Sequence, residues 1–276
     1  MSRRIALEQI CVEVNGVERV RRAVSEAFPV EAEEALEELI AAYGTPSVFV
    51  SSALIVRPLG RQHWAIIRVG HSGPSLDSSL GFRALLATNR EWKRGLDPFH
   101  LDDRHPPDWT LRGTVSAIDY EVEIAAPTLA ATFESLKTHG SPLMLGATQV
   151  LIDGGKFVLP ATEPQNAMFR AIWTMQPYAS RIEFSFATFA FGPNLGVNAV
   201  AMPDPPAILP AGALNSEQVQ DYPEGRYELA MQLAIEGQHQ EEFDWLLRRK
   251  SSKQVLWTAL LLIVAMTAAL LLSKLL

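Results

Sequence analysis

The feature that most constrains this chain is a run of 20 residues without a charged side chain, Gln254 to Ser273, close to its C-terminus. A helix rises about 1.5 Å per residue, so 20 residues span about 30 Å, the thickness of a bilayer's hydrocarbon core. Trp257 stands near one end of the run, where an indole ring favours the membrane interface. The sequence therefore predicts a single C-terminal transmembrane helix within residues 253–276. The side chains expected to contact lipid are Val255, Leu256, Trp257, Leu260, Leu261, Leu262, Ile263, Val264, Leu270, Leu271 and Leu272.

The charges on either side of this segment predict its orientation. Arg248, Arg249, Lys250 and Lys253 precede it, and only Lys274 follows it. Because basic residues stay on the cytoplasmic side of a membrane, the N-terminal part is expected in the cytoplasm and the C-terminus on the far side. The sequence thus predicts a single-pass, tail-anchored membrane protein that has the lipid bilayer as one partner.

The composition excludes several classes of protein. The 276 residues include 31 Asp+Glu against 24 Lys+Arg, a formal net charge of −7. This balance argues against general nucleic-acid binding, which uses a basic surface. Hydrophobic residues make up 48% of the chain, enough for a sizeable core. The single cysteine, Cys11, excludes an intramolecular disulfide and a cysteine-based zinc site.

The N-terminal half of the chain mixes helical and extended patterns. Apolar residues recur at spacings of three and four over 17–43, which predicts a helix. Residues 47–58 and 63–70 are β-branched and apolar, and the short loop between them predicts a β-hairpin. The segment 80–92 is expected to form the next helix.

The C-terminal half repeats this mixture. Its expected elements are a strand over 114–124, a helix over 127–139, strands over 148–152 and 156–159, a helix over 162–175, strands over 182–190 and 197–201, and a helix over about 223–249 with a break at Gly237. Neighbouring hairpins interrupted by helices are typical of an α+β fold. The predicted fold class is therefore α+β, with antiparallel hairpins, interspersed helices and one C-terminal transmembrane helix.

Changes in composition predict the domain organisation. Four prolines between Pro203 and Asn215 favour a stiff linker. We expect a cytoplasmic α+β domain over 1–202, this linker over 203–215, a juxtamembrane helical segment over 216–252 and the anchor over 253–276.

One polar loop, residues 97–108, carries the candidate metal ligands. His100, Asp102, Asp103 and His105 supply imidazole and carboxylate groups, which suit divalent metals. Their spacing fits no established motif, and the Asp-Pro and Pro-Pro steps favour a structured surface loop. Phosphate-binding, dinucleotide-binding, zinc-protease and nucleophile-elbow motifs do not occur in the sequence. We predict no catalytic residue, no metal and no cofactor, and a metal-dependent hydrolase that uses this loop stays open as the alternative.

Four segments carry a resemblance to a known family: GRQHWAIIRVG, LGFRALLATNREW, DPFHLDDRHPPDW and AIWTMQPYASRIEFSFATFAFGPN. Over residues 47–202 the chain resembles the N-terminal domain of the GTPase-associated proteins of bacterial conflict systems. In that family a helix that ends in proline is followed by an arginine and a strand with an SFsT pattern. The matching residues are Pro177, Arg181, Ser185, Phe186 and Thr188.

The resemblance implies an adaptor that acts beside a GTPase or an effector, with no enzyme activity assigned. The chain departs from the family at Phe82-Arg83-Ala84-Leu85, where the family has a helix of small or His-rich residues. Arg181 and Ser185 are the predicted partner-binding residues.

The period of two along 182–190 predicts which side chains of that strand are buried. The residues expected in the core are Ile182, Phe184, Phe186 and Thr188, and those expected to meet water or a partner are Glu183, Ser185, Ala187 and Phe189. Together these patterns predict a non-enzymatic, tail-anchored adaptor. A third interpretation is an envelope or division factor that only tethers.

Overall fold

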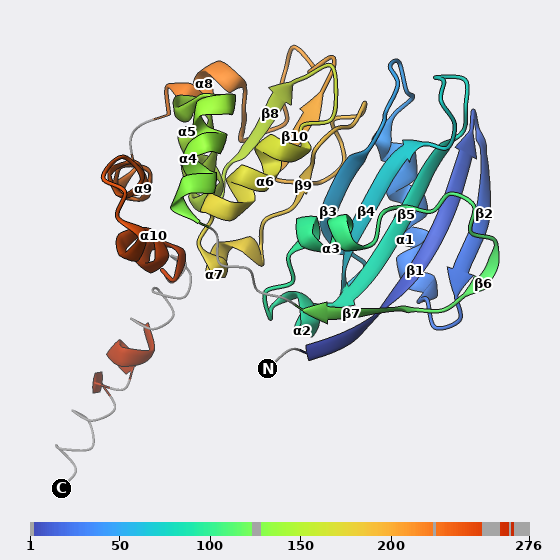
Figure 1. The fold of residues 1–276 in the computed structure, drawn as a ribbon, viewed down its shortest axis with the longest axis horizontal. Coiled ribbons are helices and arrows are strands. Elements are labelled where there is room, and N and C mark those ends of the chain that lie inside the picture. The colour runs from blue at the N-terminus through green and yellow to red at the C-terminus, as the bar shows by residue number, and fades with distance from the viewer. Residues whose placement is uncertain (1–2, 123–127, 223–224, 250–259, 265, 268–276) are drawn as a thin grey trace, which may run out of the picture.

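The computed structural model describes residues 3–122, 128–222, 225–249, 260–264 and 266–267. One large mixed sheet runs through them (Figure 1). Its strands are β1 (Arg3–Asn15), β2 (Glu18–Ser25), β3 (Ala53–Leu59), β4 (His63–His71), β5 (Leu80–Thr88), β6 (Gly113–Val115), β7 (Ile118–Val122), β8 (Lys156–Pro160), β9 (Phe186–Ala187), β10 (Ala199–Met202) and β11 (Ala213–Leu214). The strand order is β11-β8-β10-β9-β3-β4-β5-β1-β2-β6, and β7 pairs with the first part of β1.

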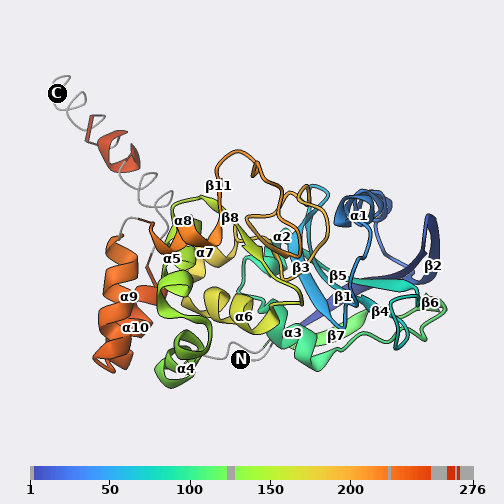
Figure 2. The same cartoon turned by 90° about the horizontal axis from the view of Figure 1, so that it is seen from above.

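The helices cover both faces and one end of this sheet. They are α1 (Val30–Tyr43), α2 (Asn89–Trp92), α3 (Pro98–Arg104), α4 (Leu129–His139), α5 (Ser141–Ile152), α6 (Asn166–Met175), α7 (Tyr178–Arg181), α8 (Ser216–Gln220), α9 (Arg226–Glu236) and α10 (Gln240–Leu247). Figure 2 shows α1 and α3 on opposite sides of the sheet. The helices α4, α5, α8, α9 and α10 gather at the end of the molecule farthest from β1 and β2 (Figures 1 and 2).

The central strands β3, β4 and β5 are apolar on both faces. Along β3, Leu54 and Val56 belong to one buried apolar cluster, and Ile55, which lies between them, belongs to another. The first cluster includes Phe99 of α3 and the aromatic residues of α6, whereas the second includes Leu36 and its neighbours on α1. Side chains alternate across a strand, so each face of these strands requires its own cover of helices.

The predicted fold class is wrong in how the strands pair. The pairs β1–β2, β1–β5, β3–β4 and β4–β5 are antiparallel, as expected. The strands β8, β9, β10 and β11, however, pair with one another in parallel, and β6 is parallel to β2. Parallel strands need long crossover connections, and α6 and α7 lie in the connection between β8 and β9. The fold is therefore a mixed α/β sheet with helices on both faces.

Several predicted helices and strands differ from those in the structure. The segment 80–92, predicted as a helix, is β5 followed by the short α2. Every residue from Leu80 to Ala87 is buried, and a continuous apolar run does not distinguish a buried strand from a buried helix. The segment 148–152, predicted as a strand, is the end of α5, and 17–43 is divided between β2 and α1.

Other elements are confirmed. The expected β-hairpin is β3 and β4, which turn at Gly60, a residue with a positive φ of 68°. The helices predicted over 127–139 and 162–175 correspond to α4 and α6, and Gly237 separates α9 from α10.

The predicted transmembrane helix is corrected by the structure. Among the described residues, no helix is both long and apolar enough to cross a membrane. Five of the predicted anchor residues lie in the described part of the chain, and they are helical: Leu260, Leu261, Leu262, Ile263 and Val264. The expected single-pass, tail-anchored location and its orientation depended on that helix and are overturned with it. Six of the predicted anchor residues lie outside the described residues: Val255, Leu256, Trp257, Leu270, Leu271 and Leu272.

The helices that follow the proline-rich segment share the core of the sheet. Tyr227, Met231 and Phe243 belong to the same buried cluster as the side chains of α3 and α6. The hydroxyl of Tyr227 donates to the backbone oxygen of Met175 at 2.7 Å, and β11 pairs with β8. The boundaries expected at 1–202, 203–215 and 216–252 stay a prediction.

The segment after α3 crosses the sheet over a slot formed by two glycines. Gly70 and Gly81 are partners across β4 and β5, and the ring of Trp109 lies against both. A Cβ atom at Gly81 would lie 2.5 Å from two ring carbons of Trp109, so only glycine fits there. Beside the slot, Arg83 donates to the backbone oxygen of Pro106 at 2.6 Å. The glycines thus bring the crossing segment close enough to accept hydrogen bonds from the sheet.

Replacement of Phe186 by alanine is expected to destabilise the fold by about 3–5 kcal/mol, the usual range for a large aromatic side chain lost from a core. Phe186 is fully buried, and its ring stacks on that of Phe99 at 5.3 Å. The matched control is Phe133→Ala, at a position that is 36% exposed. Urea unfolding of both variants measures the difference, and equal free energies of unfolding would contradict this account of the core.

Candidate functional site

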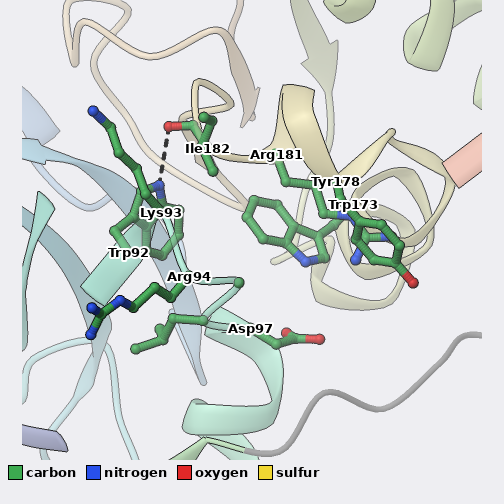
Figure 3. A pocket seen from close by; sticks show the side chains of 10 residues that line it. Trp92, Lys93, Arg94, Asp97, Trp173, Tyr178, Arg181 and Ile182 are labelled. Carbon is green, nitrogen blue, oxygen red and sulfur yellow. Dashed lines mark hydrogen bonds between the residues drawn. The ribbon is translucent and has the colours of Figure 1, made fainter. Parts of the chain in front are cut away.

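A pocket of about 360 Å³ opens between the end of α2 and the α6–α7 segment (Figure 3). Its apolar walls are the side chains of Trp92, Trp173, Tyr178 and Ile182. This volume lies at the small end of the range of ligand pockets, about 300–1,000 Å³. The pocket therefore has room for a small ligand or for one side chain of a partner.

Trp92 is fixed in the pocket wall by local sequence and by packing. Thr88 and Glu91 form a capping box that begins α2, and Trp92 ends that helix. Its ring stacks on Trp64 of β4, with the centroids 4.5 Å apart and the planes 8° apart. Its Nε1 donates to the backbone oxygen of Ile182 at 3.1 Å. One indole thus connects the central sheet to the end of α7.

Trp173, on α6, lines the pocket next to Trp92. Its ring is 3% exposed and lies 5.7 Å from Trp92, centroid to centroid. Its Nε1 is buried and has no hydrogen-bond partner among the described residues. Buried N–H groups nearly always have an acceptor, so this indole is the exception in the pocket.

Arg181 places a fixed cation beside Trp173. Its Nε donates to the backbone oxygen of Gln176 at 3.0 Å, and its Nη2 donates to that of Thr174 at 2.6 Å. Its guanidinium carbon lies 4.5 Å from the ring centroid of Tyr178 and 5.9 Å from that of Trp173. Burial lowers the pKa of Arg181, and Tyr178 is the largest opposing influence. An arginine still remains protonated near neutral pH.

The charges around the pocket are mainly positive. Lys93, Arg94 and Arg181 line it together with one acidic residue, Asp97. The carboxylate of Asp97 accepts from the backbone N–H groups of Phe99 and His100, which caps α3. In Figure 3 the side chains of Lys93 and Arg94 extend away from Trp173, so they act at the rim.

The chemical groups in this pocket suit binding better than catalysis. None of the described residues that line it is a serine, threonine, cysteine or histidine, the usual partners of a nucleophile–base pair. Asp97 is its one carboxylate, and that group already caps a helix.

The loop that carries the candidate metal ligands is partly helical. Residues 98–104 form α3, in which Asp102 pairs with Arg68 of β4 (Nε to Oδ1, 2.6 Å) and Asp103 with Arg170 of α6 (2.7 Å). Burial lowers the pKa of Arg68 to about 10, so this guanidinium stays charged at neutral pH. Among the described residues, no group of three or more His, Cys, Asp and Glu side chains is arranged to hold a metal ion.

The two histidines of the loop both lie near the ring of Tyr120. The ring centroid of His100 is 6.2 Å from that of Tyr120, and the centroid of His105 is 5.9 Å from it. Burial lowers the pKa of His105, and the positive charges of Arg83 and Arg104 lower it further. The histidines therefore pack against an aromatic ring of β7.

Arg181 and Ser185, the predicted partner-binding residues, are not brought together in one site. Ser185 is 6% exposed, and its hydroxyl donates to Oδ1 of Asn198 at 2.7 Å. The backbone N–H of Asn198 in turn donates to the Ser185 hydroxyl at 3.1 Å. The face predicted to meet water is in fact buried at Ser185, Ala187 and Phe189, and only Glu183 is exposed.

The sequence patterns did not identify Trp92, Trp173 or Tyr178. Trp92 and Trp173 are 81 positions apart, and no sequence spacing predicts their contact. The contact depends on the tertiary fold, which brings α6 next to α2. The one available signal was the sequence WTMQPYASR around Arg181, in which aromatic residues flank an arginine at the end of a helix.

Ser185→Ala is expected to lower the free energy of unfolding by about 1 kcal/mol, because it removes buried hydrogen bonds to Asn198. The control is Ser135→Ala on an exposed turn of α4, which should have almost no effect. Thermal unfolding of both variants tests this, and an unchanged Ser185→Ala protein would show that the Asn198 contact contributes nothing.

Asp102→Asn is expected to destabilise the protein by about 3–5 kcal/mol, because it leaves the partly buried Arg68 without its counter-charge. The neighbouring Asp103 is 52% exposed, so Asp103→Asn should change stability by less than about 1 kcal/mol. Chemical unfolding compares the two variants. Equal effects would contradict a structural role specific to Asp102.

No protein-family model matches this chain, and no curated protein is significantly similar to it. The resemblance to GTPase-associated proteins of bacterial conflict systems therefore stays a prediction.

Proposed function

We propose that the protein is a non-enzymatic binding module, an adaptor that recognises its ligand in the pocket lined by Trp92, Trp173 and Tyr178. The observation that carries this proposal is the buried Nε1 of Trp173, which lacks a hydrogen-bond partner among the described residues. An unsatisfied buried donor costs about 1–3 kcal/mol. A ligand that supplies an acceptor to this group would recover that free energy on binding.

The rigidity of the pocket also supports a binding role. Trp92 is held by its bond to Ile182 and by the stack on Trp64. On the other side, two backbone oxygens fix the guanidinium of Arg181. Binding to a pre-formed site loses little conformational entropy, so more of the contact energy contributes to affinity.

A GTPase or an effector, which the sequence resemblance implies as partner, would be recognised through this pocket. The arginine of the resembling motif, Arg181, lies at its wall. The alternative of a metal-dependent hydrolase finds no support in the surroundings of α3, where Arg68 and Arg170 occupy the two carboxylates.

The test uses the full chain labelled with 5-fluorotryptophan, which gives one ¹⁹F resonance for each of the six tryptophans. Trp173→Phe assigns the resonance of Trp173. A library of small fragments of all charge types is then screened for shifts of that resonance, and mass spectrometry follows the fragments over time.

We expect a subset of fragments to shift the Trp173 resonance and to be recovered unchanged. Trp173→Phe keeps the apolar wall but removes the donor, so it should weaken their binding roughly fivefold, the equivalent of about 1 kcal/mol. Trp245→Phe is the matched control, since Trp245 lies on α10 and is 68% exposed. A library without one binder at Trp173, or a fragment converted to product, would contradict the binding module.

A further inference from the structure

The pocket also indicates which chemical class of ligand it selects, an inference that rests on the proposed binding function. We propose that it binds a planar aromatic group that bears one carboxylate. The free acid and the C-terminal aromatic residue of a polypeptide share this chemistry.

The requirement for an acceptor comes from two fixed donors on one wall. The Nε1 of Trp173 has no partner among the described residues, and it is screened from solvent. An acceptor on a ligand bound beside Trp173 would supply this missing partner. Arg181 adds a cation beside the same ring, 5.9 Å from the centroid of Trp173. An uncharged acceptor would satisfy the indole, but a carboxylate would also be attracted by the guanidinium.

The requirement for a planar apolar body comes from the walls. The rings of Trp92 and Trp173 are in contact, with centroids 5.7 Å and planes 55° apart, and Tyr178 and Ile182 complete the lining. Aromatic pairs prefer tilted or offset arrangements with centroids about 4.5–7 Å apart, so a ligand ring that lies beside the two indoles, against this aromatic lining, gains contact with it. The volume of about 360 Å³ limits the ligand to a small ring system.

A single negative charge fits the pocket better than a phosphate dianion. The Nε and Nη2 groups of Arg181 already donate to backbone oxygens. Fewer of its N–H groups are therefore left to bind the oxygens of a ligand. Lys93 and Arg94 extend away from Trp173 (Figure 3), which leaves the inner wall with one cation. Asp97, the one acidic residue among those that line the pocket, would repel a second negative charge.

The probes are four naphthalenes that differ only in the group they carry: 2-naphthoate, 2-naphthamide, 2-naphthyl phosphate and 2-naphthylmethylamine. A short peptide with a C-terminal phenylalanine, as the free carboxylate and as the amide, separates a polypeptide source from a free acid. Calorimetry gives the affinities, and the ¹⁹F resonance of Trp173 in the full-length protein shows that binding is at this pocket.

We expect 2-naphthoate to bind at least tenfold more tightly than the amide and the phosphate, and the amine to bind least. Arg181→Gln should remove most of the preference for carboxylate over amide. Arg181 also bonds two backbone oxygens, so Trp173→Phe provides a second variant, with roughly fivefold weaker binding of 2-naphthoate expected.

Equal affinity for the acid and the amide at Trp173 would overturn the ligand class while the binding module stands. Tighter binding of the phosphate would overturn it in the same way. If neither these probes nor the fragment library shift the Trp173 resonance, both the ligand class and the proposed function fail.

Discussion

The structure depends on one constraint: the strands β3, β4 and β5 carry apolar side chains on both faces, so neither face can be left to water. Helix α1 covers one face, and α3 with the segment after it covers the other. The second cover lies over two arginines of the sheet, Arg68 and Arg83. Because a buried cation without a partner is strongly unfavourable, the covering elements must bring acceptors. Asp102 and the backbone oxygen of Pro106 supply them.

The same requirement positions the pocket. Trp64 lies on the face that α3 covers, and Trp92 stacks on it at the end of α2. Phe186 and Trp173 continue this aromatic layer toward α6, with centroids 6.0 Å apart. The pocket lies at the edge of this layer, beside Trp173, and is lined by residues of α2, α6 and α7. The candidate site is thus a gap at the edge of the core, and its shape follows from rings that already stabilise the sheet.

The sequence predicted the parts of the fold that have local signals. The β3–β4 hairpin, which has a glycine at its turn, was found in this way, and the helix expected over 127–139 is α4. The strand β5 was not, because its buried residues do not alternate with polar ones. The uncharged C-terminal run predicted a membrane helix from length and composition alone, and the described part of the chain does not contain such a helix. Of the pocket, only Arg181 was predicted, since Trp92 and Trp173 meet through the tertiary fold.

The glycine pair beneath Trp109 has a consequence for how the sheet reaches its correct alignment. Gly70 and Gly81 lie opposite each other only when β4 and β5 pair in the native register. A slip of two residues keeps every side chain on its proper face, so burial alone would tolerate it. Such a slip would put Arg68 or Arg83 opposite one of the glycines and place a guanidinium where the indole belongs. The ring of Trp109 could then not pack against the sheet. The segment around Pro106, which supplies the acceptor for Arg83, would lose its place on the sheet. The packing of Trp109 on this glycine pair therefore favours the native register of β4 and β5 over a slipped one.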